Sequence, residues 1–313
     1  AGVIDLAAAK TLTLSSGAML VHATGGSYTA STNAAIFINN GATFRVDANA
    51  TIPVGVDLLL GTTGGSGATW SNTSGATATI AGIADLKKGT VSANLTVVSG
   101  GQIRAFDTND IVTLSGTTTV QSGGMLWVRE IANNAVATEL NVTGTLNNAG
   151  IIELNNVSGS SAQVVTLDMT GGGSLNNNTG GAINIELGSA NNGRTLKGTV
   201  NNAGGTINVN TNALFDAGTL TNTGSISIAT GVTLEIDAGD TLVQGTGGTY
   251  TGASGSTLFI DDGAIFRFDA NGTIASGLRV LLGSVGGAGA TWSNTGGATA
   301  TIAGVADLQR GTV

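Results

Sequence analysis

The sequence contains one long stretch twice, and this repeat limits what the chain can fold into. Residues 41–91 recur as residues 263–313, and the two copies of this 222-residue repeat align without a gap. Both copies contain the run Gly-Ala-Thr-Trp-Ser-Asn-Thr, with Trp70 in the first and Trp292 in the second. The match also extends upstream at the same offset, to Leu20 in the first copy.

The repeat predicts how the chain is organised. A repeat that keeps strict register and is cut by both ends of the sequence is typical of a segment from a longer repetitive polypeptide. We therefore expect residues 1–222 to form one full unit and residues 223–313 to begin the next. Both would belong to a single continuous structure that spans residues 1–313.

The composition excludes several classes of protein. Only 10% of the residues are charged, against about 25% in ordinary soluble domains, so Thr, Ser, Asn and Gly must cover the surface. The net charge is −8 and the 11 basic residues are scattered, which disfavours nucleic acid as a partner. The chain has no cysteine, which excludes a disulfide scaffold. No apolar run approaches the roughly 18 residues of a membrane helix.

Short alternating segments predict β-strands along the whole chain. Residues 11–14, 95–98 and 111–114 each alternate between apolar and polar side chains and are followed by a Ser-Gly turn. Alternation with period two, closed by a turn signal, is the pattern of a half-buried strand. No segment has the 3.6-residue period of a helix, so we expect an all-β protein.

The middle of the chain contains a finer repeat. Related runs begin at Gly144, Gly173, Gly198 and Gly218, and the spacing between them shortens along the chain. A fixed motif with unequal spacing indicates coils of roughly 20 residues that carry insertions in one loop. A series of β-sandwiches would need repeats of about 100 residues, and a propeller would need blades of about 40–50 residues. The pattern therefore predicts a parallel β-helix, or β-solenoid.

In this fold, apolar side chains of each coil stack on those of the next coil inside the rod. We expect inward positions at Leu146, Ile152, Leu175, Ile183, Val200, Ile207, Leu220 and Ile226. Thr145, Thr199 and Asn208 would face water. Asn and Gly would occupy corners with positive φ, and stacked Asn side chains would form amide ladders. At one coil per 4.8 Å, the chain would give about 14 coils and a 222-residue unit about 10.

The runs at 144–150 and 218–226, together with the cysteine-free Thr/Asn/Gly composition, resemble the β-helix passengers of bacterial surface proteins. The similar groups are autotransporter adhesins and filamentous-haemagglutinin-like exoproteins. The resemblance implies a right-handed helix, secretion through the outer membrane to the cell surface or the extracellular space, and a role in adhesion, aggregation or biofilm. The 222-residue unit departs from their simpler repeats and indicates a giant protein with many units.

Trp70 and Trp292 are candidate ligand-binding residues. Each follows a glycine-rich run and is followed by Ser and Asn, so an exposed indole there would stack on a sugar ring once per unit. The alternative is that the indole fills core volume that the glycines leave empty. We favour the alternative, because large aromatic residues are mostly buried.

Two further sets of charged residues have simple explanations. Arg45 with Asp47, repeated as Arg267 with Asp269, fall on the same side of a strand and predict a solvated ion pair. The acidic runs 107–110 and 261–262 lack the spacing of calcium-binding loops. We therefore expect loop polarity there and no metal site.

A catalytic site is not expected. Glycoside hydrolysis needs two carboxylates about 5–10 Å apart, and the carboxylates here are dispersed, although Glu235 and Asp237 fall on one face. The only histidine, His22, is replaced by Gln244 in the second copy. The distinctive strand 125–130 predicts core Met, Trp or Leu residues with one polar edge.

The sequence thus predicts a structural or adhesive segment that is not an enzyme and needs no cofactor. Its partners would be further repeats of its own chain, or other copies through end-to-end or lateral association, with surface glycans as a further candidate. An alternative is a carbohydrate-active β-helix with its groove in residues 92–222, and a third is a glycan-binding module that uses Trp70 and Trp292.

Overall fold

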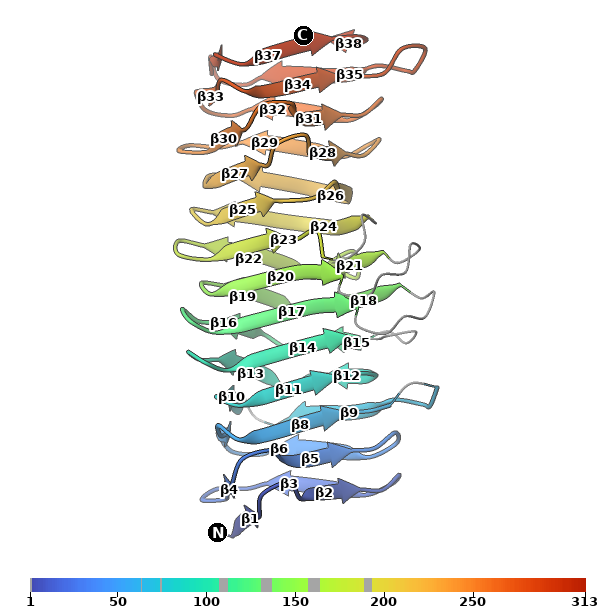
Figure 1. The fold of residues 1–313 in the computed structure, drawn as a ribbon, viewed down its shortest axis with the longest axis vertical. Coiled ribbons are helices and arrows are strands. Elements are labelled where there is room, and N and C mark those ends of the chain that lie inside the picture. Colours follow the sequence, from blue (N-terminus) through green and yellow to red (C-terminus); the bar gives the residue numbers. More distant parts are fainter. Residues whose placement is uncertain are drawn as a thin grey trace.

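The chain coils into a β-solenoid whose two ends lie at opposite ends of a rod (Figure 1). This computed structural model describes residues 2–62, 64–73, 75–106, 112–130, 137–156, 164–188 and 193–313. Within these ranges the chain forms 38 strands and no helix, and hence no helix that could cross a membrane. The expected all-β solenoid of parallel strands is confirmed.

The strands stack in three ladders, which we call faces I, II and III. Face I forms a 13-stranded parallel sheet and crosses the front of Figure 1. Its strands are β2 (Thr11–Leu14), β5 (Ala34–Ile38), β8 (Val56–Leu60), β11 (Ile83–Leu86), β14 (Gln102–Phe106), β17 (Met125–Glu130), β20 (Ile151–Asn156), β23 (Ala182–Ile185), β25 (Thr206–Val209), β27 (Ser225–Ile228), β30 (Thr249–Gly252), β33 (Gly272–Ile274) and β36 (Ala300–Ile302).

Face II follows face I in every coil. Its strands are β3 (Met19–His22), β6 (Thr43–Val46), β9 (Ala68–Asn72), β12 (Gly89–Val91), β15 (Val112–Leu114), β18 (Thr138–Val142), β21 (Val165–Asp168), the first parts of β24 (Arg194–Ala203) and β26 (Ala213–Asn222), then β28 (Thr233–Ile236), β31 (Ser256–Ile260), β34 (Leu278–Leu282) and β37 (Val305–Leu308).

Face III completes the coil. It contains β1 (Val3–Leu6), β4 (Ser27–Ala30), β7 (Ala50–Ile52), β10 (Thr77–Ile80), β13 (Asn94–Val97), β16 (Thr118–Val120), β19 (Thr145–Asn148), β22 (Ser174–Asn178), the second parts of β24 and β26, β29 (Thr241–Gln244), β32 (Ile265–Phe268), β35 (Ala290–Asn294) and β38 (Gly311–Thr312). Because β24 and β26 run through the corner between faces II and III, these faces share one 23-stranded sheet, while β1 and β4 of face III form a separate two-stranded sheet.

The core follows from the alternation of each strand. One side chain in two points into the rod, where it stacks on the equivalent side chain of the next coil, for example Leu126 on Ile103 and under Ile152. All eight inward positions named from the sequence are buried, at 0% or 1% exposed. Thr145, Thr199 and Asn208 lie on the outer side as predicted.

The coils are longer than predicted. Nine successive strand pairings on face I connect Ala35 to Thr249, so these two residues lie nine coils apart. The coils contain about 24 residues on average, whereas about 20 residues per coil were expected. The shorter value came from the closest pair of motifs, Gly198 and Gly218, whereas most coils have a longer corner. The predicted handedness is not tested and stays a prediction.

The 222-residue repeat is not a whole number of coils. The equivalent of Ala35 in the second copy is Thr257, which lies eight residues, or one face, beyond Thr249. As a result β6 of the first copy lies on face II, whereas its equivalent β32 lies on face III. The unit therefore spans nine and one-third coils, or roughly 45 Å at the spacing of β-strands, and not the 10 coils expected.

The corners use glycine where no side chain fits. Gly89 and its repeat Gly311 have φ of 133° and 145°, and a Cβ on either would collide with the carbonyl oxygen of the alanine in the coil below. Asparagine was expected at such corners, but Asn33 is the only asparagine with positive φ among the described residues.

The predicted amide ladder is present, but it lies inside the rod. The side-chain amides of Asn148, Asn177 and Asn202 each donate to the Oδ1 of the asparagine one coil on, at 2.8 Å, and the ladder ends at Asn222. Their second hydrogens reach backbone carbonyls of the next coil, such as Ala182. These asparagines end strands of face III and point inward, because their amides satisfy each other there.

Candidate functional site

Trp70 is a core residue. It is 0% exposed and packs against Phe44 with ring centroids 5.5 Å apart, above Tyr28 and His22. Burial raises the pKa of the Tyr28 hydroxyl to about 12. This column fills the rod near its first coils, so the indole of Trp70 offers no face to a sugar.

Trp292 occupies the same place in the second copy. It lies 5.2 Å from Phe266 and stacks on Phe268 at 5.6 Å, and it is 6% exposed. Binding of a ligand by Trp70 and Trp292 stays an untested prediction. It needs two exposed rings on one side, whereas both rings are buried and belong to strands of different faces.

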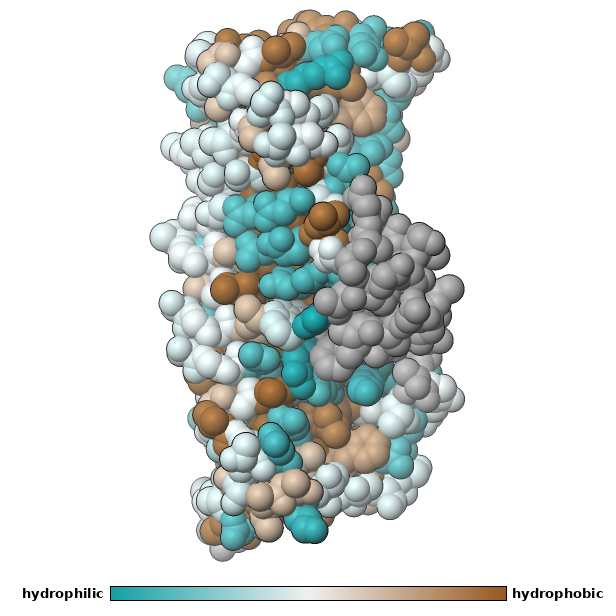
Figure 2. Space-filling view, in the orientation of Figure 1, coloured by the Kyte–Doolittle hydropathy of each residue, from teal (hydrophilic) through white to brown (hydrophobic). Residues whose placement is uncertain are grey.

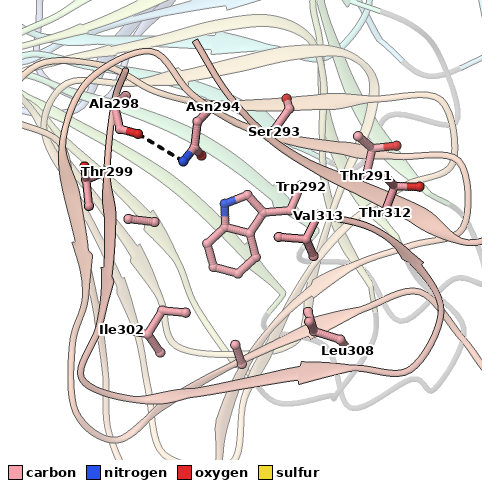
Figure 3. Close-up of a pocket in the computed structure, with 12 residues that line it drawn as sticks. Thr291, Trp292, Ser293, Asn294, Ala298, Thr299, Ile302, Leu308, Thr312 and Val313 are labelled. Carbon is pink, nitrogen blue, oxygen red and sulfur yellow. Dashed lines mark hydrogen bonds between the residues drawn. The ribbon is translucent and has the colours of Figure 1, made fainter. Parts of the chain in front are cut away.

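A hollow of about 600 Å³ opens beside Trp292. Figure 3 shows Ile302, Leu308 and Val313 around the indole, with no charged group among the lining residues. The equivalent residues of the first copy, Ile80, Leu86 and Val91, are buried under the following coil. The hollow therefore lies on the inner side of the last described coil, where the first copy has the following coil.

The predicted ion pairs are confirmed. Arg45 Nε donates to Asp47 Oδ1 at 2.8 Å and Nη2 to Oδ2 at 2.8 Å, and the Thr73 hydroxyl donates to the same carboxylate. Arg267, Asp269 and Thr295 repeat the arrangement. The arginine hydrogen bond, followed by that of the threonine, lowers the pKa of each aspartate. The pairs are solvated and stay in both copies, although they lie on different faces.

A column of charged residues follows one edge of face II. Asp168, Lys197 and Asp216 are in register in three successive coils, and Lys197 Nζ lies 3.0 Å from an oxygen of Asp216. Asp237 and Asp261 follow the next two strands of the same face. In the five coils before the column, the same row consists of Thr43, Thr69, Thr90, Thr113 and Asn141.

Three carboxylates converge at the upper end of this column. Atoms of Glu235, Asp237 and Asp261 lie within 4.8 Å of one another, the one such group of potential metal ligands within the described ranges. Burial raises the pKa of Glu235, and the charges of Asp261 and Asp237 raise it further. Such a group can hold a hard cation through oxygen or keep one carboxyl protonated as an acid.

The first copy limits the importance of this group, because Thr13, Ser15 and Asn39 stand at the three equivalent positions. The pairing of Glu235 with Asp237 was predicted from the sequence, and the approach of Asp261 was not. The sequence feature that could have predicted this approach is the spacing between Asp237 and Asp261, which equals one coil. The acidic run 107–110, for which loop polarity and no metal site were expected, lies outside the described residues.

Face I carries the one tryptophan that is turned outward. Leu126 and Val128 fill the core, whereas Met125 and Trp127 lie half-buried on the outer surface. Of the Met, Trp or Leu predicted for the core, Leu126 is therefore confirmed, and Met125 and Trp127 are corrected to the outer surface. The guanidinium carbon of Arg129 lies 5.0 Å from the Trp127 ring centroid. Hydrophilic and hydrophobic side chains alternate on this side of the rod (Figure 2).

The comparisons with known proteins identify no family for this chain. No protein-family model matches the chain, and no curated protein matches it significantly. Among solved structures, a hyper-glycosylated fragment of TibA is similar over 95% of this chain and 94% of its own, with 17% identity and a TM-score of 0.32. A likeness of this degree carries no argument about the function of this chain.

Proposed function

We propose that this chain is a structural or adhesive segment of a long bacterial cell-surface or extracellular fibre protein, without enzymatic activity. It would act as a rigid rod for adhesion, cell-cell contact or filament formation. The observation that supports the proposal is the continuous core, in which inward side chains stack coil upon coil along all three faces.

Such a core makes length inexpensive in free energy. The stability of a solenoid is close to a sum over contacts between neighbouring coils, so each added coil stabilises itself once the first few exist. The buried amide ladder from Asn148 to Asn222 adds hydrogen bonds between coils without disulfides. A repeat unit that joins the next one without a gap would extend the rod indefinitely.

The test is a set of tandem chains with one, two and three copies of residues 1–222, displayed on bacteria that do not aggregate. We expect each unit to lengthen the rod by roughly 45 Å in electron micrographs, and cell aggregation or surface attachment to increase with rod length. The proposal would be contradicted if the rods had the same length for every number of units, or if attachment did not change with rod length.

A matched pair of variants separates the rod from its surface chemistry. Ile207→Asp places a charge at a core position that is 1% exposed, whereas Thr206→Asp places the same charge on the outer surface of the same strand. A buried unpaired charge is strongly unfavourable. We expect the first variant to shorten or break the rod and abolish attachment, and the second to preserve both.

The second candidate function is carbohydrate binding, and the outward position of Trp127 with Arg129 favours it. A panel of purified polysaccharides would be screened for binding and for cleavage. Binding that is lost in Trp127→Ala but kept in Trp292→Ala would support it. Cleavage that is lost in Glu235→Gln would instead favour a carbohydrate-active enzyme.

A further inference from the structure

Charge is segregated around the rod. Seven successive crossings of face III, corners included, contain no charged residue, although the chain has 19 acidic and 11 basic residues. The crossings are residues 75–82, 92–101, 115–124, 143–150, 169–181, 198–205 and 217–224. The same coils carry charges on the other two faces, such as Glu153 on face I and Lys197 on face II.

Hydroxyl and amide groups cover this part of face III, which we call the neutral face. Two outward rows run along it, one from Thr77 to Thr219 and one from Thr79 to Thr221. Every position in these rows is Thr, Ser or Asn. Glycines occupy most of the corners on both sides, so few side chains project beyond the rows.

The neutral face is also held rigid. In the row from Thr79 to Thr221, the side-chain amides of Asn176 and Asn201 each donate to the Oδ1 of the asparagine one coil below, both at 3.0 Å. The buried ladder that includes Asn148 and Asn177 lies directly behind the same strands. A surface whose side chains are already fixed loses little conformational entropy when it binds.

We propose that the neutral face pairs laterally with the neutral face of a second copy of this chain. The inference rests on the proposed function, since it describes how rods of this kind would associate. A second copy has the same repeat of one coil along its axis, so its rows match these rows over their whole length. Polar side chains of this kind form dry interdigitated contacts when identical sheets meet.

Charge favours this face over the other two. Each copy has a net charge of −8, so copies repel each other, and exposed charges act over about 8–10 Å at moderate salt. Pairing through the neutral face keeps the charged columns of faces I and II on the outside. Pairing through face II would bring the acidic column near Asp216, Asp237 and Asp261 against its copy.

The area is sufficient for a stable contact. A face of about eight residues is roughly 25 Å wide, and seven strands are about 33 Å high at the spacings of a β-sheet. The neutral face would therefore cover on the order of 800 Å² on each copy, or about 1,600 Å² in total, the size of a standard protein interface.

The test is sedimentation of the full chain over a range of concentrations at low and high salt. We expect a dimer whose affinity changes little with salt, because no charges meet. Thr145→Lys, in the central strand of the seven, should weaken dimerisation by more than about tenfold, since like charges would face each other across the contact. Thr206→Lys, on face I, should dimerise like the parent chain.

A cross-linking experiment identifies the face directly. The chain has no cysteine, so Thr145→Cys gives a single thiol at the centre of the neutral face, and mild oxidation should produce a covalent dimer. Thr206→Cys, on face I, should give no covalent dimer. A circular dichroism spectrum and a melting curve like those of the parent would show that each variant is folded, which separates loss of pairing from loss of the rod.

Three results would overturn the proposal. The chain could sediment as a monomer at every concentration, or Thr145→Lys could dimerise as well as the parent, which would place the contact at the rod ends or on another face. In the third result, the chain would be a monomer that binds a neutral polysaccharide, and Thr145→Lys would abolish that binding. The neutral face would then be a glycan-binding surface.

Discussion

Residues 41–91 and 263–313 have nearly the same sequence and the same local strands, yet they occupy different surroundings. In the first copy β9 lies on face II and the next coil covers Trp70 completely, whereas in the second β35 lies on face III and Trp292 lines an open hollow. The strand pattern is therefore a local property of the sequence, whereas burial depends on the coil that follows and the face depends on the count of residues between the copies.

The largest expected difference concerns the two tryptophans. Trp70→Ala should lower the free energy of unfolding by about 3–5 kcal/mol, the range for removing a large buried aromatic side chain. Trp292→Ala should cost clearly less, because its ring borders the hollow, whereas a following coil covers the ring of Trp70. Hydrogen exchange of the amides of β9 and β35 would measure each region separately, since a solenoid need not unfold in one step.

An extended chain makes this comparison sharper. When residues 92–114 are added after Val313, the hollow should close and Trp292→Ala should become about as costly as Trp70→Ala. Equal costs without the extension, or no change with it, would show that the following coil does not determine the burial of the indole.

A smaller effect is expected from the pair Phe268 and Gly272, which replace Val46 and Ala50 of the first copy. A Cβ on Gly272 would lie 2.7 Å from Phe268 Cε1, so the larger ring and the missing methyl group fit each other. Phe268→Val should cost about 1–3 kcal/mol by opening a cavity. Gly272→Ala alone should also destabilise by crowding the ring.

The double variant Phe268→Val with Gly272→Ala recreates the first copy. We expect it to be more stable than Phe268→Val alone, because the alanine methyl partly fills the space. A double-mutant cycle from urea denaturation would give the coupling between the two positions. If the destabilisation in the double variant equals the sum for the two single variants, the side chains at positions 268 and 272 are not coupled through packing.

The smallest effect concerns Glu235, which replaces Thr13 of the first copy. Its pKa is raised in the folded chain above the ordinary value of 4.5, by burial and then by Asp261 and Asp237. The folded state therefore holds this proton more tightly than the unfolded state, so stability falls as pH rises through the interval between the two pKa values.

Glu235→Thr should accordingly raise the melting temperature slightly at pH 7. The gain should disappear below pH 4.5, the ordinary glutamate value, where the carboxyl is protonated in both states. Melting curves of both proteins across this pH range would check the sign. A variant that is less stable than the parent at pH 7 would mean that Glu235 has a favourable partner that outweighs its neighbours.

Much of the fold could be predicted from the sequence, because a solenoid repeats the same local rule. Alternation identified the inward residues, among them Leu146 and Ile226, and the repeated Asn-Asn runs predicted an amide ladder. The position of that ladder could not be predicted, since the preference of Asn for turns favours corners. Asn177 lies inside because the stacked amides satisfy each other, which is a property of neighbouring coils.

The candidate site was less predictable for a related reason. The spacing of Arg45 and Asp47 within one strand was enough to predict their ion pair. In contrast, the approach of Asp261 to Glu235 and the charge-free crossings of face III require the coil length, which the closest pair of motifs underestimates. An error of a few residues per coil is enough to place a side chain on the wrong face.

The extra third of a coil in the 222-residue repeat determines the directions in which a multi-unit rod could make contacts. Residues 297–304 repeat residues 75–82, the first crossing of the neutral face, but their strand β36 lies on face I. In a chain with further units, the position of the neutral face would move by one side of the rod with each unit and return to the same side after three units. Each rod could then join three neighbours at different heights, and the result would be a cross-linked bundle that resists peeling from any side.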